Sequence, residues 1–213
     1  MGRLALHLSP ARGSLFVVGD RLSRTNHEPR ITDPMKLTVD LSINDYDREL
    51  FAERKLIFEQ REGEGLVHVM LKVLALALFY EPKLVVEPSF EDEYKPDLLL
   101  RADDYRPALW IECGAVSTRK LDKITFRYNT SRFVVVKQTG REAADLAERC
   151  RDEVRRAHVI EFVGFEKDFC LRVAERMSGR NDAIVIVSGT SVQVVLGGVT
   201  ESSQLFRYSL PEA

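Results

Sequence analysis

A short hairpin near the middle of the chain limits the available folds more than any other segment. Two apolar runs of strand length, 98–100 and 108–109, flank a polar stretch that is rich in turn-forming residues. An antiparallel hairpin with its turn between residues 104 and 105 pairs these runs. It also places Asp97 opposite Glu112 on one face, with Cβ atoms about 5 Å apart. The sequence therefore predicts two neighbouring carboxylates at the open end of a hairpin.

Two interpretations of this pair are open from the hairpin alone. Facing carboxylates repel, and each raises the pKa of the other unless a cation lies between them. A divalent metal ion is the simplest reason for a chain to build such a pair. In the other interpretation, Asp97 belongs to the turn chemistry that follows Pro96, and Glu112 points to solvent.

A basic helix is expected directly after the second strand of the hairpin. Ser117 or Thr118 is a suitable N-cap for it. Its basic residues recur at helical spacing on one face, with one more on the flank: Lys120, Lys123 and Arg127, and Arg119. The helix begins where the strand of Glu112 ends, so this face can look onto the carboxylates. Phosphate-transfer sites combine acids and cations in this way, although a charged helix face is more often simply solvated.

A second helix, expected over residues 64–80, is apolar around most of its circumference and should be buried on most sides. Its polar exceptions are Glu64, His68 and Lys72, which are four residues apart and form one stripe. The stripe marks the side of the helix that meets a polar cavity. For His68 we keep the ordinary interpretation, a core histidine with a hydrogen-bond partner.

The rest of the chain predicts a mixed β-sheet flanked by helices, which is an α/β fold. Alternating apolar residues over 37–43 indicate a half-buried strand, and the all-apolar run 133–136 is typical of a sheet centre covered on both faces. Further strands are expected at 50–58, 84–90, 158–163, 183–188, 191–196 and 205–210, and helices at 141–156 and 166–177. The alternation of strand and helix after residue 133 predicts a parallel portion joined to the antiparallel hairpin.

Taken together, these segments resemble the bacterial YaeQ family, which carries a variant of the PD-(D/E)XK nuclease fold. The resemblance covers roughly Met35 to Leu210. It rests on Glu64 with the apolar helix and a basic residue at 72, Pro96-Asp97, Trp110-Ile111-Glu112-x-Gly114 and Arg119-Lys120-Leu121-x-Lys123. It implies a restriction-endonuclease-like core and a Mg²⁺ or Mn²⁺ cofactor. In the family pattern Asp97 is the metal-binding Asp, Glu112 the second acid and Glu64 the acid of the first core helix.

One position departs from the superfamily pattern. Gly114 stands two residues after Glu112, where the superfamily normally has lysine. Glycine at this position is usual for the YaeQ family. The lysine role then passes to the basic helix, and Lys123 is our first choice because its side chain can bend back toward the end of the Glu112 strand. Lys120 is better cast as a substrate contact, together with Arg119 and Arg127 on the same helix.

Two functions follow from this resemblance. The first is a Mg²⁺-dependent, nuclease-like phosphodiesterase acting on DNA or RNA, with Glu64, Asp97 and Glu112 as metal ligands. The second is a non-catalytic nucleic-acid-binding or regulatory module that retains the nuclease fold. The net charge of −2 excludes a generally basic nucleic-acid binder but leaves room for a local basic groove.

Composition agrees with one cytoplasmic domain over residues 35–213. Residues 1–34 carry five Arg and three acids without lasting periodicity, which predicts a disordered or loosely attached extension. The three cysteines lack CxxC spacing and are interpreted as reduced thiols. No apolar run reaches the ~18–20 residues of a membrane span. Glycine-rich nucleotide-binding motifs are absent from the sequence, so no nucleotide cofactor is expected.

Overall fold

A single mixed β-sheet organises the protein. The computed structural model describes residues 36–59, 65–90 and 93–212. Within these ranges the strands are β1 (Lys36–Asp45), β2 (Leu50–Glu59), β3 (Val85–Val86), β4 (Leu98–Arg101), β5 (Pro107–Cys113), β6 (Arg132–Val136), β7 (Ile160–Phe165), β8 (Arg180–Ser188), β9 (Ser191–Leu196) and β10 (Val199–Ser209). The helices of the same ranges are α1 (Leu66–Leu78), α2 (Thr118–Arg127), α3 (Gly140–Glu153) and α4 (Phe169–Ala174), with a short 3-10 turn, η1 (Ala157–Val159). The expected mixed α/β fold is confirmed.

The strands follow the order β2-β1-β8-β9-β10-β7-β6-β5-β4-β3 across the sheet. Neighbours are parallel at β1–β8, β5–β6 and β6–β7, and the other pairs are antiparallel. β6 is parallel to both neighbours, and its residues 133–136 are all buried. This confirms the central position that its unbroken apolar run predicts.

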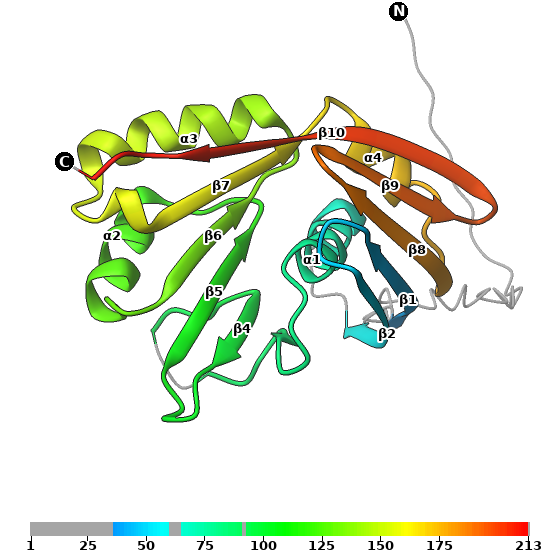
Figure 1. Ribbon diagram of the computed structural model, residues 1–213, viewed down its shortest axis with the longest axis horizontal. Coiled ribbons are helices and arrows are strands. Elements are labelled where there is room, and N and C mark those ends of the chain that lie inside the picture. The colour runs from blue at the N-terminus through cyan, green and yellow to red at the C-terminus, as the bar shows by residue number, and fades with distance from the viewer. Residues whose placement is uncertain (1–35, 60–64, 91–92, 213) are drawn as a thin grey trace, which may run out of the picture. The chain divides into compact units, whose positions relative to one another are not determined.

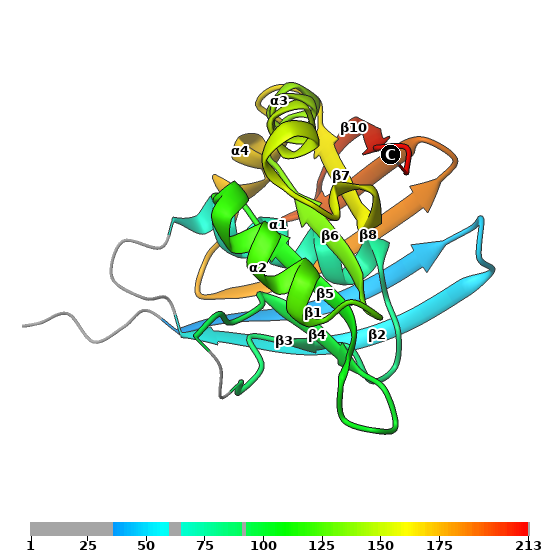
Figure 2. The same ribbon diagram turned by 90° about the vertical axis from the view of Figure 1, so that its left-hand side faces the viewer.

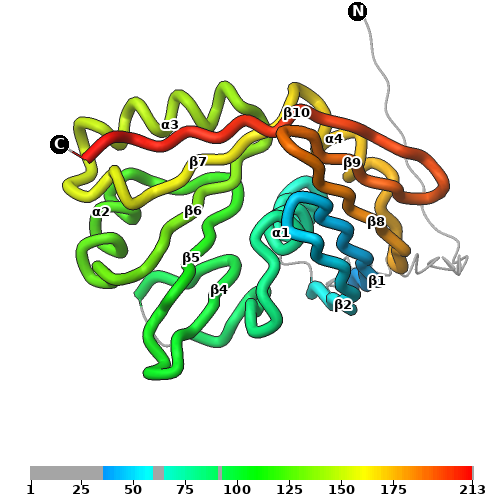
Figure 3. The backbone as a smooth tube through the Cα atoms, in the orientation of Figure 1, coloured from blue at the N-terminus to red at the C-terminus, as the bar shows by residue number. Residues whose placement is uncertain are grey.

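β10 joins the two parts of the sheet. Its first half, 199–204, pairs with β9, and its second half, 205–209, pairs with β7. Figure 1 and Figure 3 show this strand crossing from the β8–β9 part to the β6–β7 part. One continuous strand therefore connects segments that lie far apart in the sequence.

Helix α1 lies against both parts of the sheet. All residues from Val69 to Leu78 are buried, and the helix contacts β1, β4, β5, β8 and α4. This confirms the expected helix that is buried on most sides. No helix in the described ranges is long and apolar enough to cross a membrane.

The hairpin has the expected register. Leu98 pairs with Ile111 and Leu99 with Trp110, and the backbone N–H of Asp97 continues the pairing by donating to the Ile111 carbonyl at 3.0 Å. The register shifts only near the turn, after Leu100. Asp97 and Glu112 thus occupy facing backbone positions at the open end of the hairpin.

Helices α2 and α3 pack beside each other on the face of β5–β7 that carries Trp110 and Phe133 (Figure 2). The N-cap of α2 is Ser117, whose hydroxyl accepts a hydrogen bond from the backbone N–H of Lys120 at 3.2 Å. It is also tied to the segment after α3, because Arg155 donates to the Asp122 carboxylate at 2.8 Å. These contacts fix the rotation of α2 about its own axis relative to the end of β5.

Three expectations differ from the structure in extent. The strand expected over 84–90 is limited to Val85–Val86, since Pro88 lacks an N–H for a longer ladder. The helix expected over 166–177 covers only Phe169–Ala174. β10 begins at Val199 instead of 205, because its first half is largely exposed and carries polar residues that give no apolar signal.

Candidate functional site

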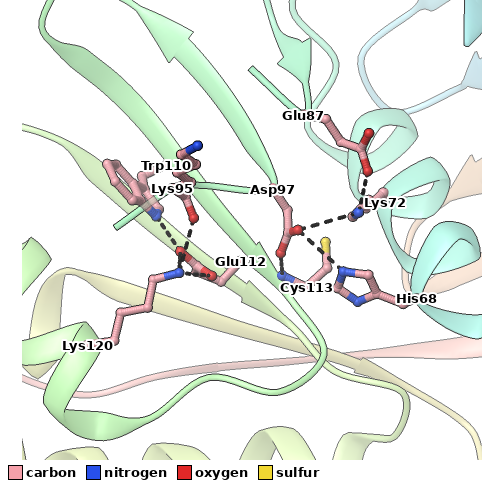
Figure 4. A network of polar contacts seen from close by, with 9 residues as sticks. All are labelled: His68, Lys72, Glu87, Lys95, Asp97, Trp110, Glu112, Cys113 and Lys120. Atoms are coloured by element: carbon pink, nitrogen blue, oxygen red, sulfur yellow. Dashed lines mark hydrogen bonds and ion pairs between the residues drawn. The ribbon is translucent and has the colours of Figure 1, made fainter. Parts of the chain in front are cut away.

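Asp97 anchors a polar network at the open end of the hairpin (Figure 4). One carboxylate oxygen accepts the backbone N–H of Cys113 at 2.7 Å. The other lies 3.4 Å from His68 Nε2 and 3.7 Å from Lys72 Nζ. Burial alone would raise the pKa of Asp97, but the hydrogen bonds from His68 and Cys113 and the charges of His68 and Lys72 hold this pKa below its ordinary value. Asp97 is therefore ionised at neutral pH.

Lys72 is the buried cation of this network. Its side chain is only 4% exposed, and its ammonium group donates to Glu87 Oε1 at 2.6 Å. The expected polar stripe of α1 is thus confirmed for His68 and Lys72, which both turn toward Asp97. Glu64, the third member of the stripe, lies outside the described residues.

Glu112 is held from the other side by α2. Its carboxylate accepts the indole N–H of Trp110 at 2.7 Å and lies 2.7 Å from Lys120 Nζ. The same ammonium group donates to the Lys95 carbonyl at 3.1 Å. Burial raises the pKa of Glu112; Lys120 and the Trp110 hydrogen bond oppose this rise, and the negative charge of Asp97 adds to it.

The two acids face each other in the backbone, but the expectation that their side chains share one face is not confirmed. Asp97 takes its side-chain partners from α1 and Glu112 from α2, and these helices belong to different hydrophobic clusters of the sheet. Asp97 is held by α1 and by the N–H of Cys113, the residue directly after Glu112. Glu112 is held by α2. The charge of Asp97 still acts on Glu112, as the raised pKa of Glu112 reflects. Within the described ranges, no group of three His, Cys, Asp or Glu residues is arranged to hold a metal ion.

Gly114 has a physical reason to replace lysine. Its φ is +72°, a conformation that favours glycine, and a Cβ at this position would lie 3.1 Å from His68 Nδ1. The ammonium group of Lys137 donates a hydrogen bond to the Gly114 carbonyl at 2.7 Å, and burial lowers the pKa of Lys137. A lysine at 114 would have to adopt a strained backbone and press against His68.

The structure brings Lys120, not Lys123, to Glu112. The expectation that Lys123 bends back toward Glu112 is wrong: its ammonium group lies 3.7 Å from Glu93 and 5.4 Å from the centre of the Tyr94 ring. The physical reason is the helix geometry, because, three residues further along, the side chain starts about 4.5 Å further along the axis and points about 60° to one side. With Ser117 as the N-cap, the first turn places Lys120 over the end of β5.

The remaining basic residues lie on the outer side of α2. Arg127 is exposed, with its guanidinium carbon 5.9 Å from the centre of the Tyr128 ring, and Arg119 is exposed near the N-terminus of the helix. The structure places neither residue at the carboxylates. Their expected contact with nucleic acid remains a prediction.

Sequence reasoning missed three members of the network: Glu87, Trp110 and Lys137. Trp110 could have been found, because residues two apart in a strand share a face and its indole N–H then points along the strand toward Glu112. Glu87 and Lys137 belong to no periodic pattern. Their side chains reach the site only through the tertiary fold.

These features define the class of the protein. It is a mixed α/β domain in which a central hairpin carries two acids, one paired with a lysine of the enclosed helix α1 and one with a lysine of α2. The model of the family described as "YaeQ protein" matches residues 33–204, so the chain belongs to the YaeQ family.

Two solved structures share the fold. The YaeQ protein from Xanthomonas axonopodis pv. citri matches with a TM-score of 0.72 and 21% identity, over 84% of this chain and 99% of that one. The YaeQ protein from Pseudomonas syringae matches with a TM-score of 0.71 and 19% identity, over 84% of this chain and 98% of that one. A comparison with curated proteins gives no match. At these identities the likeness establishes the fold alone.

Proposed function

We propose that this protein is a metal-dependent, nuclease-like phosphodiesterase that acts on nucleic acid, with a restriction-endonuclease-like core formed by β4–β7 and the helices packed on them. The ion pair between Lys120 and Glu112 at 2.7 Å carries the proposal. It supplies a lysine beside Glu112, although Gly114 occupies the position where the superfamily normally has one. Two acids and one lysine are the groups that this class of reaction requires.

The chemistry of the donor set fits Mg²⁺ or Mn²⁺. Mg²⁺ is commonly bound by one or two carboxylates, with water and phosphate oxygens as the remaining ligands. Asp97 and Glu112 would hold the ion, and a role for Glu64 as a third ligand remains a prediction. A bound ion of this kind lowers the pKa of its water and neutralises phosphate charge.

The chain's own residues would divide the work. Asp97 is kept ionised and oriented by His68, Lys72 and the N–H of Cys113. Glu112 would hold the ion in place of its present contact with Lys120. The ammonium group of Lys120 would then face the scissile phosphate and stabilise its developing negative charge.

A second function is favoured by one observation. Both acids already have protein cations beside them, Lys72 at 3.7 Å from Asp97 and Lys120 at 2.7 Å from Glu112. This arrangement suits a non-catalytic nucleic-acid-binding or regulatory module in which the acids hold the helices in place.

Cleavage assays on single-stranded and plasmid substrates with Mg²⁺ or Mn²⁺ distinguish the two functions. For a nuclease, Asp97→Asn, Glu112→Gln and Lys120→Met should each abolish cleavage, whereas Lys55→Met, a matched change at a surface ion pair on β2, should retain it. Mn²⁺ titration should show tighter metal binding in Lys120→Met, because the competing cation is gone. Wild-type protein that binds no Mn²⁺ and cleaves no substrate would leave the non-catalytic function.

A further inference from the structure

A small cavity lies one turn further along α2 from the acids. Its volume is about 290 Å³, and its walls combine three aromatic rings with three cations: Tyr94, Phe126, Tyr128, Lys123, Arg127 and Arg155. Pockets for small organic ligands begin at about 300 Å³, so this one has room for a single compact group.

Each cation at the cavity lies near an aromatic ring. Lys123 Nζ is 5.4 Å from the centre of the Tyr94 ring, and the guanidinium carbon of Arg155 is 4.3 Å from that of Phe126. Arg155 is also fixed by hydrogen bonds of 2.8 and 2.9 Å to Asp122, so its guanidinium group is already oriented. The walls therefore present flat π surfaces with positive charge beside them.

The charge and exposure of the walls select the ligand. Three cations lie at the walls, two of them beside a carboxylate: Lys123 is 3.7 Å from Glu93, and Arg155 is 2.8 Å from Asp122. Phe126 is 60% exposed, and its ring is a large apolar surface left in contact with solvent. An anionic group with a flat aromatic ring is complementary to both features.

From this arrangement we propose that the cavity binds one nucleotide of a single-stranded nucleic acid, with the base stacked on Phe126 and the phosphate beside Arg127. The inference rests on the proposed function and names the form of its substrate. Aromatic platforms beside cations are the usual means of holding single strands, because every unpaired base offers a π face. In a duplex those faces are stacked inside the helix and unavailable.

The cavity is connected to the acids through two short links. Tyr94 precedes Asp97 by three residues, and the Lys95 carbonyl between them accepts the ammonium group of Lys120. On α2, Lys123 is three residues after Lys120, a rise of about 4.5 Å along the axis. A strand held at the cavity would therefore extend directly toward the Asp97–Glu112 site.

Fluorescence anisotropy with a labelled oligothymidine and the corresponding duplex tests the proposal, with EDTA present so that cleavage cannot contribute. Wild-type protein should bind the single strand more tightly than the duplex. Phe126→Ala should weaken binding of the single strand by about tenfold or more, and Phe126→Trp should retain it. The matched control is Phe51→Ala on β2, since Phe51 is 65% exposed and lies on the edge strand of the other part of the sheet.

A charge series tests the phosphate contact. Arg127→Ala should reduce the slope of log Kd against log salt by about one, whereas Arg141→Ala on α3, whose side chain is 91% exposed, should leave it unchanged. The proposal is overturned if Phe126→Ala binds like wild type, if the duplex binds as tightly as the single strand, or if wild type binds neither. Single-strand binding without metal-dependent cleavage would uphold this inference and refute the proposed nuclease.

Discussion

Replacing Lys72 by methionine should destabilise the fold because it removes the only buried cation near two carboxylates in the described part of the chain. Lys72 lies 2.6 Å from Glu87 and 3.7 Å from Asp97, and its side chain is 4% exposed. Methionine is an unbranched apolar side chain of similar length, so the cavity term is small. The change therefore measures mainly the electrostatic contribution of the ammonium group.

The magnitude follows from the burial of the acids that would remain. Removing one partner of a fully buried ion pair costs about 3–5 kcal/mol. Here the Glu87 and Asp97 side chains keep 22% and 20% exposure, and Asp97 retains His68 and the Cys113 N–H. We therefore expect the lower end, a loss of about 3 kcal/mol. With a urea m-value of about 2 kcal/mol/M, the unfolding midpoint should fall by about 1.5 M.

Urea unfolding followed by circular dichroism at pH 7 measures this loss. Lys55→Met is the matched control, because Lys55 pairs with Asp40 at 3.3 Å on the surface, where an ion pair contributes less than about 1 kcal/mol. Lys72→Met combined with Glu87→Gln should recover part of the loss, since one unpaired carboxylate is neutralised. The reasoning is refuted if Lys72→Met unfolds at the same urea concentration as Lys55→Met.

Three further predictions concern the same site. Glu112→Gln should unfold at a higher urea concentration than wild type at pH 7–8. The pKa of Glu112 is raised above 4.5 in the folded protein, so wild type loses stability as the pH rises above 4.5. The difference between the two proteins should therefore vanish below pH 4.5. Asp97→Asn should be less stable than wild type at pH 7, and the gap should close as pH falls below the ordinary value of 3.8, because the lowered pKa of Asp97 provides its stability only above that range. Gly114→Ala should lower the thermal midpoint more than Gly189→Ala. Both positions have a positive φ, which costs about 1–2 kcal/mol in either variant, but of the two only Gly114 has a neighbour, His68, within 4 Å of the added Cβ. Equal midpoints would argue against the His68 contact.

The parts of the site that could be predicted from sequence are those set by local pattern. The register that places Asp97 opposite Glu112 follows from two apolar runs and the turn between them, and the backbone pairing confirms it. That the His68 and Lys72 side chains point to a polar site follows from their spacing on an otherwise apolar helix. In both cases the information lies within about twenty residues.

The parts that could not be predicted depend on how separate elements meet. The sequence shows that Lys120 and Lys123 share a helical face but not the rotation of that helix over β5, which the cap at Ser117 and the contact between Asp122 and Arg155 determine. Likewise, β8 pairs with β1 instead of β7, a parallel pairing between segments about 140 residues apart. No local pattern encodes such a pairing.

The two-part pairing of β10 has a consequence for how the chain reaches this structure. β7 and β9 each lie next to β10 in the sheet, and β10 follows both in the sequence. β9 is joined to β10 by a tight turn, but the edge of β7 stays unpaired during synthesis until residues 205–209 of β10 are made. Partners distant in sequence fold slowly, and unpaired edges promote aggregation in the meantime. Refolding from denaturant should accordingly be slow and sensitive to protein concentration. If chaperones assist folding during expression, the step they assist should be the late pairing of β10 with β7.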